Sequence, residues 1–258
     1  ALTGARVVEI IEALRPERSY NINFNYNRLL KGKHFSLQVD GSAWYSYFSN
    51  QIIPDYDADP NKIIYKNLDG YSLSKGMTLN LDFNYGHRLK ALAGITIQSI
   101  KKMEIDAAGN KTSQVPKITK KWSGTWSVSY SIPGGGWSFD YTGNIYGPMR
   151  LPILGPRDPR PAYSPVWSLQ NLQGTKKLGR AIECFAGVKN ILNWTPARRV
   201  PFLIARSQDP FDKAVEYEQD GSVKVTADNP YGLSFDPAYV YAPNQGRRLF
   251  AGLRFTLR

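Results

Sequence analysis

Apolar and polar residues alternate along several segments of this chain. From position 20 to 27, every even residue is apolar or aromatic and every odd residue is Asn. A period of two places one kind of side chain on each face of a β-strand. The pattern recurs at 73–85, 122–132, 137–145 and 249–257, and less regularly at 35–47, 89–97, 166–173 and 182–188. We therefore predict an all-β, antiparallel chain of about nine strands.

The connections between the predicted strands alternate in length. Short ones lie at 30–33, 86–88, 133–136 and 176–179, and long ones lie at 50–61, 106–120, 147–164 and 194–245. Short periplasmic turns and long extracellular loops are typical of outer-membrane β-barrels. In that orientation the C-terminus is expected on the periplasmic side. Only the segment 7–14 reads as helical, and the Arg15-Pro16 pair would end such a helix.

The class of the protein depends on what covers the apolar face, because soluble β-sandwiches alternate too. Long strands and a polar face of Asn, Ser, Thr, Asp and Gly favour a transmembrane barrel with a hydrated or plugged lumen. Aromatic residues near the strand ends are typical of the two membrane interfaces, although they also occur at the rims of soluble sheets. The predicted lipid-interface aromatics are Tyr26, Phe35, Tyr130 and Trp137 beside short turns, and Tyr20, Tyr45, Tyr47 and Trp122 at the opposite ends.

The predicted strand number is odd, whereas bacterial single-chain barrels have even numbers. An unpaired sheet edge inside lipid leaves backbone groups unsatisfied at several kcal/mol each. The 258 residues begin with Ala1, and no signal peptide pattern follows. Either the predicted strand number is wrong by one, or the first strand pairs with strands outside this sequence, and the missing signal peptide favours the second interpretation.

Lysine and arginine outnumber aspartate and glutamate by 33 to 21, a formal net charge of +12. A basic balance suggests nucleic acid, anionic lipid or acidic ligands as partners. Since the basic residues are spread along the chain and form no nucleic-acid recognition motif, we expect no nucleic-acid partner. One cysteine and two histidines are too few for a cysteine metal cluster or a histidine-based triad. We predict that the chain is not an enzyme.

Two segments, AGVKNILN at 186–193 and LRPERS at 14–19, carry a resemblance to a known family. The first is similar to a motif near the end of TonB-dependent outer-membrane receptors of the Bacteroidetes type, and the second is similar to a segment that opens one of their strands. The segments DPFD at 209–212, DNPYG at 228–232 and FDP at 235–237 resemble their last extracellular loop. The segment 239–255 is similar to their closing strand.

The resemblance implies that residues 1–258 are the C-terminal part of a barrel of about 22 strands. The N-terminal plug and first barrel half would lie outside this sequence, and the TonB complex would act through that plug. Outer-membrane lipid and lipopolysaccharide are further expected partners. The implied function is TonB-dependent import of a scarce nutrient, with a ferric siderophore, haem or cobalamin as the leading candidates. An oligosaccharide or peptide importer with a surface lipoprotein, and an autonomous barrel enzyme or adhesin, are the alternatives.

Ligand capture is expected at the extracellular loops and the upper lumen, because loops on a rigid scaffold carry function. The longest loop, 194–245, offers cations and aromatic rings that suit an anionic or aromatic ligand. Equally, these residues could pack the loop on itself. The candidates are Arg198, Arg199, Phe202, Arg206, Phe211, Tyr217, Tyr231, Phe235, Tyr239 and Tyr241.

Alternating carboxylates in the loop 50–61 form a candidate calcium site. Asp55, Asp57 and Asp59 would supply the oxygen ligands that Ca²⁺ prefers. A solvated turn is the alternative interpretation, since Pro60 stands where an EF-hand has glycine. We expect no other cofactor.

Overall fold

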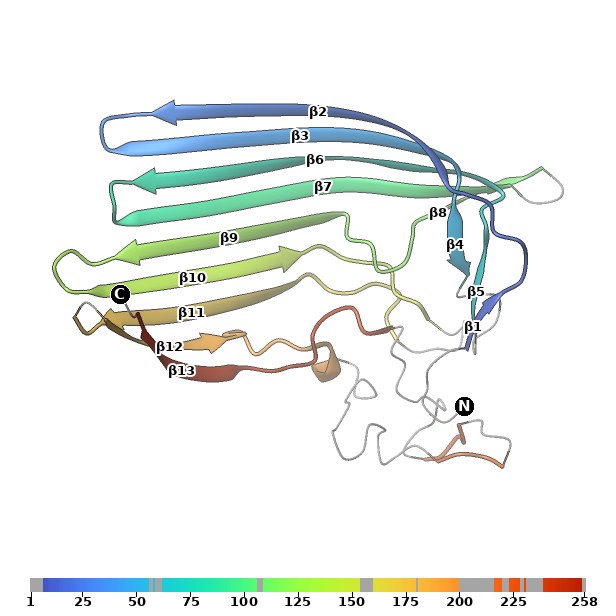
Figure 1. Cartoon of the computed structure of the whole chain (residues 1–258). Coiled ribbons are helices and arrows are strands. Elements are labelled where there is room, and N and C mark those ends of the chain that lie inside the picture. Colours follow the sequence, from blue (N-terminus) through green and yellow to red (C-terminus); the bar gives the residue numbers. More distant parts are fainter. Residues whose placement is uncertain are drawn as a thin grey trace.

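The computed structural model describes residues 7–55, 58, 62–105, 109–153, 160–179, 181–199, 216–219, 223–227, 230 and 239–256. Nine strands form one antiparallel ladder in chain order, and β8 (Lys111–Gln114) pairs beside β7 (Figure 1). The ladder runs through β2 (Arg18–Lys31), β3 (Phe35–Asn50), β6 (Gly70–Tyr85), β7 (Leu89–Ile105), β9 (Trp122–Ser131), β10 (Trp137–Tyr146), β11 (Trp167–Lys177), β12 (Ile182–Lys189) and β13 (Arg248–Phe255). The nine predicted strands are confirmed.

The short turns all lie at one end of this ladder and the long connections at the other (Figure 1). The C-terminus lies at the short-turn end. Gly86 occupies the turn between β6 and β7 with a φ of 54°, a left-handed conformation that glycine adopts without a steric penalty. The arrangement matches the predicted alternation of short and long connections.

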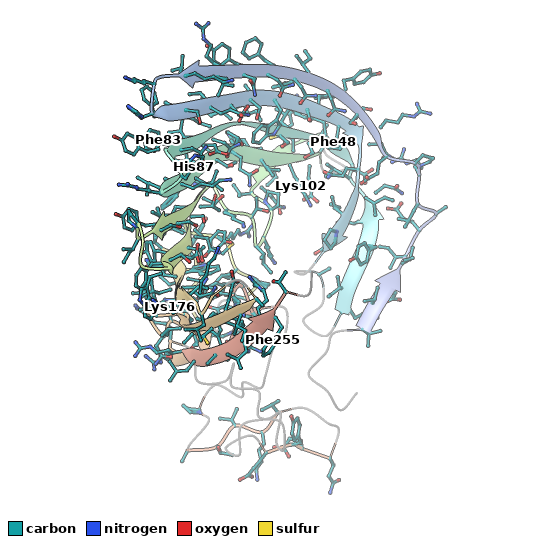
Figure 2. The ribbon with its side chains drawn as sticks, turned by 60° about the vertical axis from the view of Figure 1, so that its left-hand side comes forward. Phe48, Phe83, His87, Lys102, Lys176 and Phe255 are labelled. Atoms are coloured by element: carbon teal, nitrogen blue, oxygen red, sulfur yellow. The ribbon has the colours of Figure 1, made fainter. Side chains whose placement is uncertain are left out.

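The two faces of the ladder differ in chemistry. Across strands, Asp40 lies opposite Asn80 and Gln38 opposite Asp82, and the Thr78 and Thr96 hydroxyls are 3.0 Å apart. The sheet curves into an arch, with Lys102 on its inner side and Phe83 on its outer side (Figure 2). Because residues 96 and 102 are an even number of positions apart on β7, the inner side is the polar face.

A second, small sheet lies at the loop end of the ladder (Figure 1). It consists of β1 (Val7–Ile10), β5 (Lys62–Asn67) and β4 (Ile52–Asp55), with β1 parallel to β5. The prediction of a helix at 7–14 is wrong. The β-branched residues Val7, Val8 and Ile10 favour an extended backbone, and β5 supplies a pairing partner that the local sequence did not reveal.

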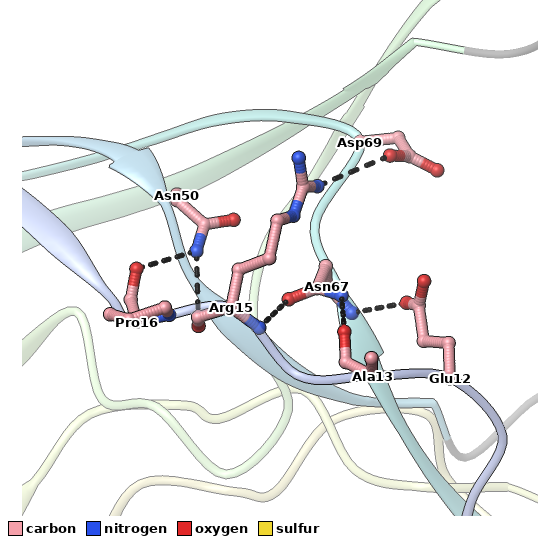
Figure 3. A network of polar contacts seen from close by, with 7 residues as sticks. All are labelled: Glu12, Ala13, Arg15, Pro16, Asn50, Asn67 and Asp69. Atoms are coloured by element: carbon pink, nitrogen blue, oxygen red, sulfur yellow. Dashed lines mark hydrogen bonds and ion pairs between the residues drawn. The ribbon is translucent and has the colours of Figure 1, made fainter.

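The segment before β2 is held against this small sheet by polar contacts (Figure 3). The buried Asn67 side chain accepts a hydrogen bond from the Arg15 backbone N–H and donates one to the Ala13 carbonyl. Asn50 donates to the Pro16 carbonyl at 2.8 Å. These contacts anchor the first part of the LRPERS segment, whose last two residues begin β2.

Strands β2 and β13 end the ladder, and each pairs on one side only within the described residues. The nine-stranded ladder therefore has two free edges there. Among the described residues, none of the helices has the length and hydropathy needed to cross a membrane.

Candidate functional site

A pocket of about 410 Å³ lies at the loop end of the polar face. We call it the rim pocket. Its walls come from β4, the end of β7, β8 and the connections that follow β8 and β10. The polar lining consists of Asp55, Lys102, Glu104, Gln114, Lys117 and Arg150.

Three cations line the rim pocket against two carboxylates. Lys102 reaches it from the inner side of the arch, as Figure 2 shows. Arg150 donates a hydrogen bond to the Val115 carbonyl at 3.3 Å, which fixes its guanidinium beside the pocket. Glu104 accepts one from the Gln114 amide at 2.8 Å. The lining thus carries one more positive than negative charge and suits an anionic group.

Asp55 forms an ion pair with Lys66, with 3.0 Å between the ammonium and a carboxylate oxygen. The hydrogen bond that the Lys66 ammonium donates to Asp55 raises the pKa of that ammonium above its usual value. Asp57 and Asp59 lie outside the described residues. No cluster of three potential metal ligands occurs within the described ranges. The calcium site stays a prediction, and Lys66 competes with a cation for Asp55.

Beside the rim pocket, aromatic rings pack in a series from the barrel wall into the loops. Tyr146 contacts Trp167 with 4.3 Å between ring centroids, and Trp167 stacks on Trp194 at 5.1 Å. Trp194 meets Tyr241 edge to face, and Tyr241 meets Tyr239 in the same way. Together with Met149, Leu151 and Ala242 these rings form the hydrophobic core of the loop end. This core packs the connections that follow β10 and β12 against each other at the loop end of the ladder.

Charged groups border this aromatic series. The Lys120 ammonium lies 4.0 Å from the Tyr146 ring centroid, and burial lowers the pKa of that ammonium. Burial also raises the pKa of the Tyr241 phenol, an effect that the nearby positive charge of Arg199 opposes. The cations at the loop end are therefore placed near ring faces as well as near the rim pocket.

Those predicted ligand residues that the structure describes are either buried or exposed. Tyr239 is fully buried, its hydroxyl donates to the Pro161 carbonyl, and the Arg160 guanidinium covers its ring at 4.4 Å. Arg198, Arg199 and Tyr217 are exposed. Tyr239 and Tyr241 thus pack the loop end, which is the alternative raised for them above, and their contact with a ligand stays a prediction. Phe202, Arg206, Phe211, Tyr231 and Phe235 lie outside the described residues.

The predicted interface aromatics lie on the outer face at the two ends of the strands. Phe35, Tyr130 and Trp137 stand beside short turns, and Tyr20 is opposite Tyr47 near the loop end. Tyr20, Tyr26, Phe35, Tyr45, Tyr130 and Trp137 are exposed apolar side chains. This placement fits a role at the membrane interface, which itself stays a prediction.

Sequence reasoning missed the rim pocket. Its polar residues come from four separate segments, and only the strand pairing brings them together. The sequence did contain one indication of a cation at this pocket. The alternation of β7 extends past Ile97 and places Lys102 on the polar face, where a cation faces the lumen.

Comparisons with known proteins identify the fold. Residues 3–191 match the family model of the TonB-dependent receptor-like β-barrel. No curated protein matches the chain significantly by sequence.

Solved structures share the architecture at low sequence identity. The ferric-catecholate import receptor Fiu from E. coli K12 has 10% identity and a TM-score of 0.58, with 94% of this chain and 28% of that one covered. The pyoverdine outer-membrane receptor FpvA from Pseudomonas aeruginosa PAO1 has 14% identity and a TM-score of 0.58, with 95% and 30% covered. The FrpB iron transporter from Neisseria meningitidis has 14% identity and a TM-score of 0.51, with 73% and 28% covered.

The chain therefore spans less than a third of the length of these structures. The family match covers well over half of the 258 residues and includes eight of the nine ladder strands. The family is one of receptors rather than enzymes, and the Bacteroidetes-type subclass stays a prediction. This chain belongs to the TonB-dependent receptor family, as part of its β-barrel.

Proposed function

We propose that the chain forms the C-terminal wall of an outer-membrane receptor that imports an anionic ferric chelate. The observation that carries the proposal is the rim pocket, with Lys102, Lys117 and Arg150 around one hollow at the loop end of the polar face. A ligand arriving from the loops would meet these cations before it entered the lumen. Membership in the TonB-dependent receptor family supports import as the activity.

Energy for import would come from a TonB complex that acts on a plug outside this sequence. In the proposed orientation the short turns and the C-terminus are periplasmic, and the loop end faces the outside. This chain would contribute part of the barrel wall and the rim pocket. Chelates are favoured over neutral nutrients because the pocket lining has an excess of positive charge.

Binding of a trianionic ferric tris-catecholate to the purified receptor that contains this chain tests the proposal. Neutralising Lys102→Gln or Arg150→Gln is expected to weaken binding roughly fivefold each, because a partly exposed charge contributes up to about 1 kcal/mol. The effect should shrink at high salt, which screens charges. Titration calorimetry at two ionic strengths measures both the loss of affinity and its dependence on salt.

Lys90→Gln is the matched control. Lys90 lies on the same strand and face as Lys102, but beside the short turn. Its neutralisation should leave the affinity unchanged. Equal losses for Lys90→Gln and Lys102→Gln would contradict a ligand site at the rim pocket.

A further inference from the structure

The outer face of the ladder carries a row of bulky residues that stops abruptly. Cross-strand pairing places Phe35, Tyr85, Leu89, Tyr130 and Phe139 in line from β3 to β10. On the next three strands the same row continues as Gly174, Ala186 and Ala251. The row lies near the short turns, at the level where the interface aromatics gather. A gap therefore opens in this belt over β11, β12 and β13.

The gap is the floor of a groove. Two adjoining hollows of about 620 and 610 Å³ both include Gly174, Ala186 and Ala251. One wall is made by Trp137 and Phe139, whose rings stack at 6.2 Å with 6° between their planes. Leu249 and Leu253 of β13 form the opposite side. We call this the girdle groove.

The backbone conformation at position 174 does not require glycine. A Cβ added there would meet the Phe139 ring at 3.5 Å, an ordinary van der Waals contact. The φ of this residue also lies outside the left-handed region. A larger residue would fit and fill the groove, so the space is a property of the sequence and not of strand geometry.

A cation stands at the short-turn end of the girdle groove. Lys176 lines it, and its ammonium lies 5.0 Å from the centroid of the Trp137 ring. Its ammonium also donates to the Gly135 carbonyl in the β9–β10 turn, which holds it at the level of the turns. Figure 2 shows Lys176 on the outer side of the arch. A lysine at this level attracts anionic headgroups.

We propose that the girdle groove binds one acyl chain of an anionic phospholipid from the leaflet beside the short turns. The chain would lie over Gly174, Ala186 and Ala251, against the Trp137 and Phe139 rings. The headgroup phosphate would lie at Lys176. Two features of the groove indicate this ligand. Its apolar floor suits a hydrocarbon chain, and the cation at its short-turn end suits a negatively charged headgroup.

Native mass spectrometry of the complete receptor, stripped of lipid and titrated with phosphatidylglycerol, tests this site. The wild-type receptor should retain a phosphatidylglycerol molecule. Gly174→Leu should lower the retained fraction at least fivefold by filling the groove. Lys176→Gln should leave acyl binding but reduce the preference for phosphatidylglycerol over phosphatidylethanolamine roughly fivefold.

Gly41→Leu is the matched control, since Gly41 is opposite Tyr26 on β2 and an added Cβ there would meet only that residue, at 3.9 Å. Its lipid retention should equal that of the wild type. If Gly174→Leu fails to fold, Ala186→Leu provides a second blocking variant. Unchanged retention in a folded blocking variant, equal loss in Gly41→Leu, or preferential retention of lipid A over phosphatidylglycerol would each overturn the proposal.

Discussion

Asn190 holds the base of the connection between β12 and β13. Its φ is 52°, a left-handed conformation in which asparagine is enriched among non-glycine residues. Its side chain donates to the Trp194 and Gln245 carbonyls and accepts from the Trp194 N–H. Three residues on, Asn193 accepts from the Arg247 N–H at 2.8 Å. The AGVKNILN motif therefore closes the two ends of the last loop upon each other.

Replacing Asn190 should release this loop without unfolding the barrel. Asn190→Ala removes three hydrogen bonds from a buried position and places a less suitable residue at a positive φ. We expect a local loss of roughly 2–3 kcal/mol, at about 1 kcal/mol per hydrogen bond. Faster hydrogen exchange at the Trp194 and Arg247 amides measures it.

Two further variants separate the contributions. Asn190→Gly restores the backbone conformation but not the side-chain bonds, so exchange should remain fast. Leu192→Ala changes an exposed neighbour and should have no effect. Slow exchange in Asn190→Ala would show that the side chain does not clamp the loop.

Strand pairs are fixed where aromatic rings cover glycines of the neighbouring strand. On the inner face, the Trp44 ring of β3 lies over Gly76 of β6, and the Phe250 ring of β13 lies over Gly187 of β12. On the outer face, Trp126 of β9 covers Gly143 of β10. Each ring occupies the space that a Cβ would need, so these positions fix the register of adjacent strands.

Gly76→Ala should weaken the junction of β3, β6 and β7. An added Cβ would lie 2.6 Å from the Ile97 carbonyl oxygen and would also meet the Trp44 ring. Since backbone cannot move aside cheaply, we expect a loss of roughly 1–3 kcal/mol in the free energy of unfolding. Urea unfolding of the receptor in detergent micelles measures it. Gly41→Ala, where the space is open, should be neutral, and equal losses in both variants would refute the role assigned to Trp44.

Alternation predicted the ladder strands well because each strand has one polar and one apolar face. The short strands were missed for different reasons. β4 and β5 lie inside a connection that carries no clear alternation, and β1 depends on a partner more than fifty residues away in sequence. The sequence placed Asp55 in a loop, whereas the structure has it as the last residue of β4, and its ion pair with Lys66 depends on the pairing of β4 with β5.

Within the described residues, the molecule as a whole is an open, curved sheet with two unpaired edges, β2 and β13. Every residue of β2 is exposed, and Leu249 of β13 is 80% exposed. Inside lipid, the unpaired backbone groups of such edges cost several kcal/mol each. That further strands complete the barrel, as the odd strand number suggested, stays a prediction; the chain spans less than a third of the length of its structural relatives.

Uptake of a radiolabelled ferric tris-catecholate tests the central claim most directly. Iron-starved cells would carry the complete receptor that contains this chain, with or without a functional TonB complex. We predict uptake that falls to background when TonB is absent and that falls roughly fivefold at limiting chelate in Arg150→Gln, with normal receptor levels in the membrane. Uptake that is unaffected by loss of TonB, or no uptake of the chelate by the folded receptor, would contradict the account.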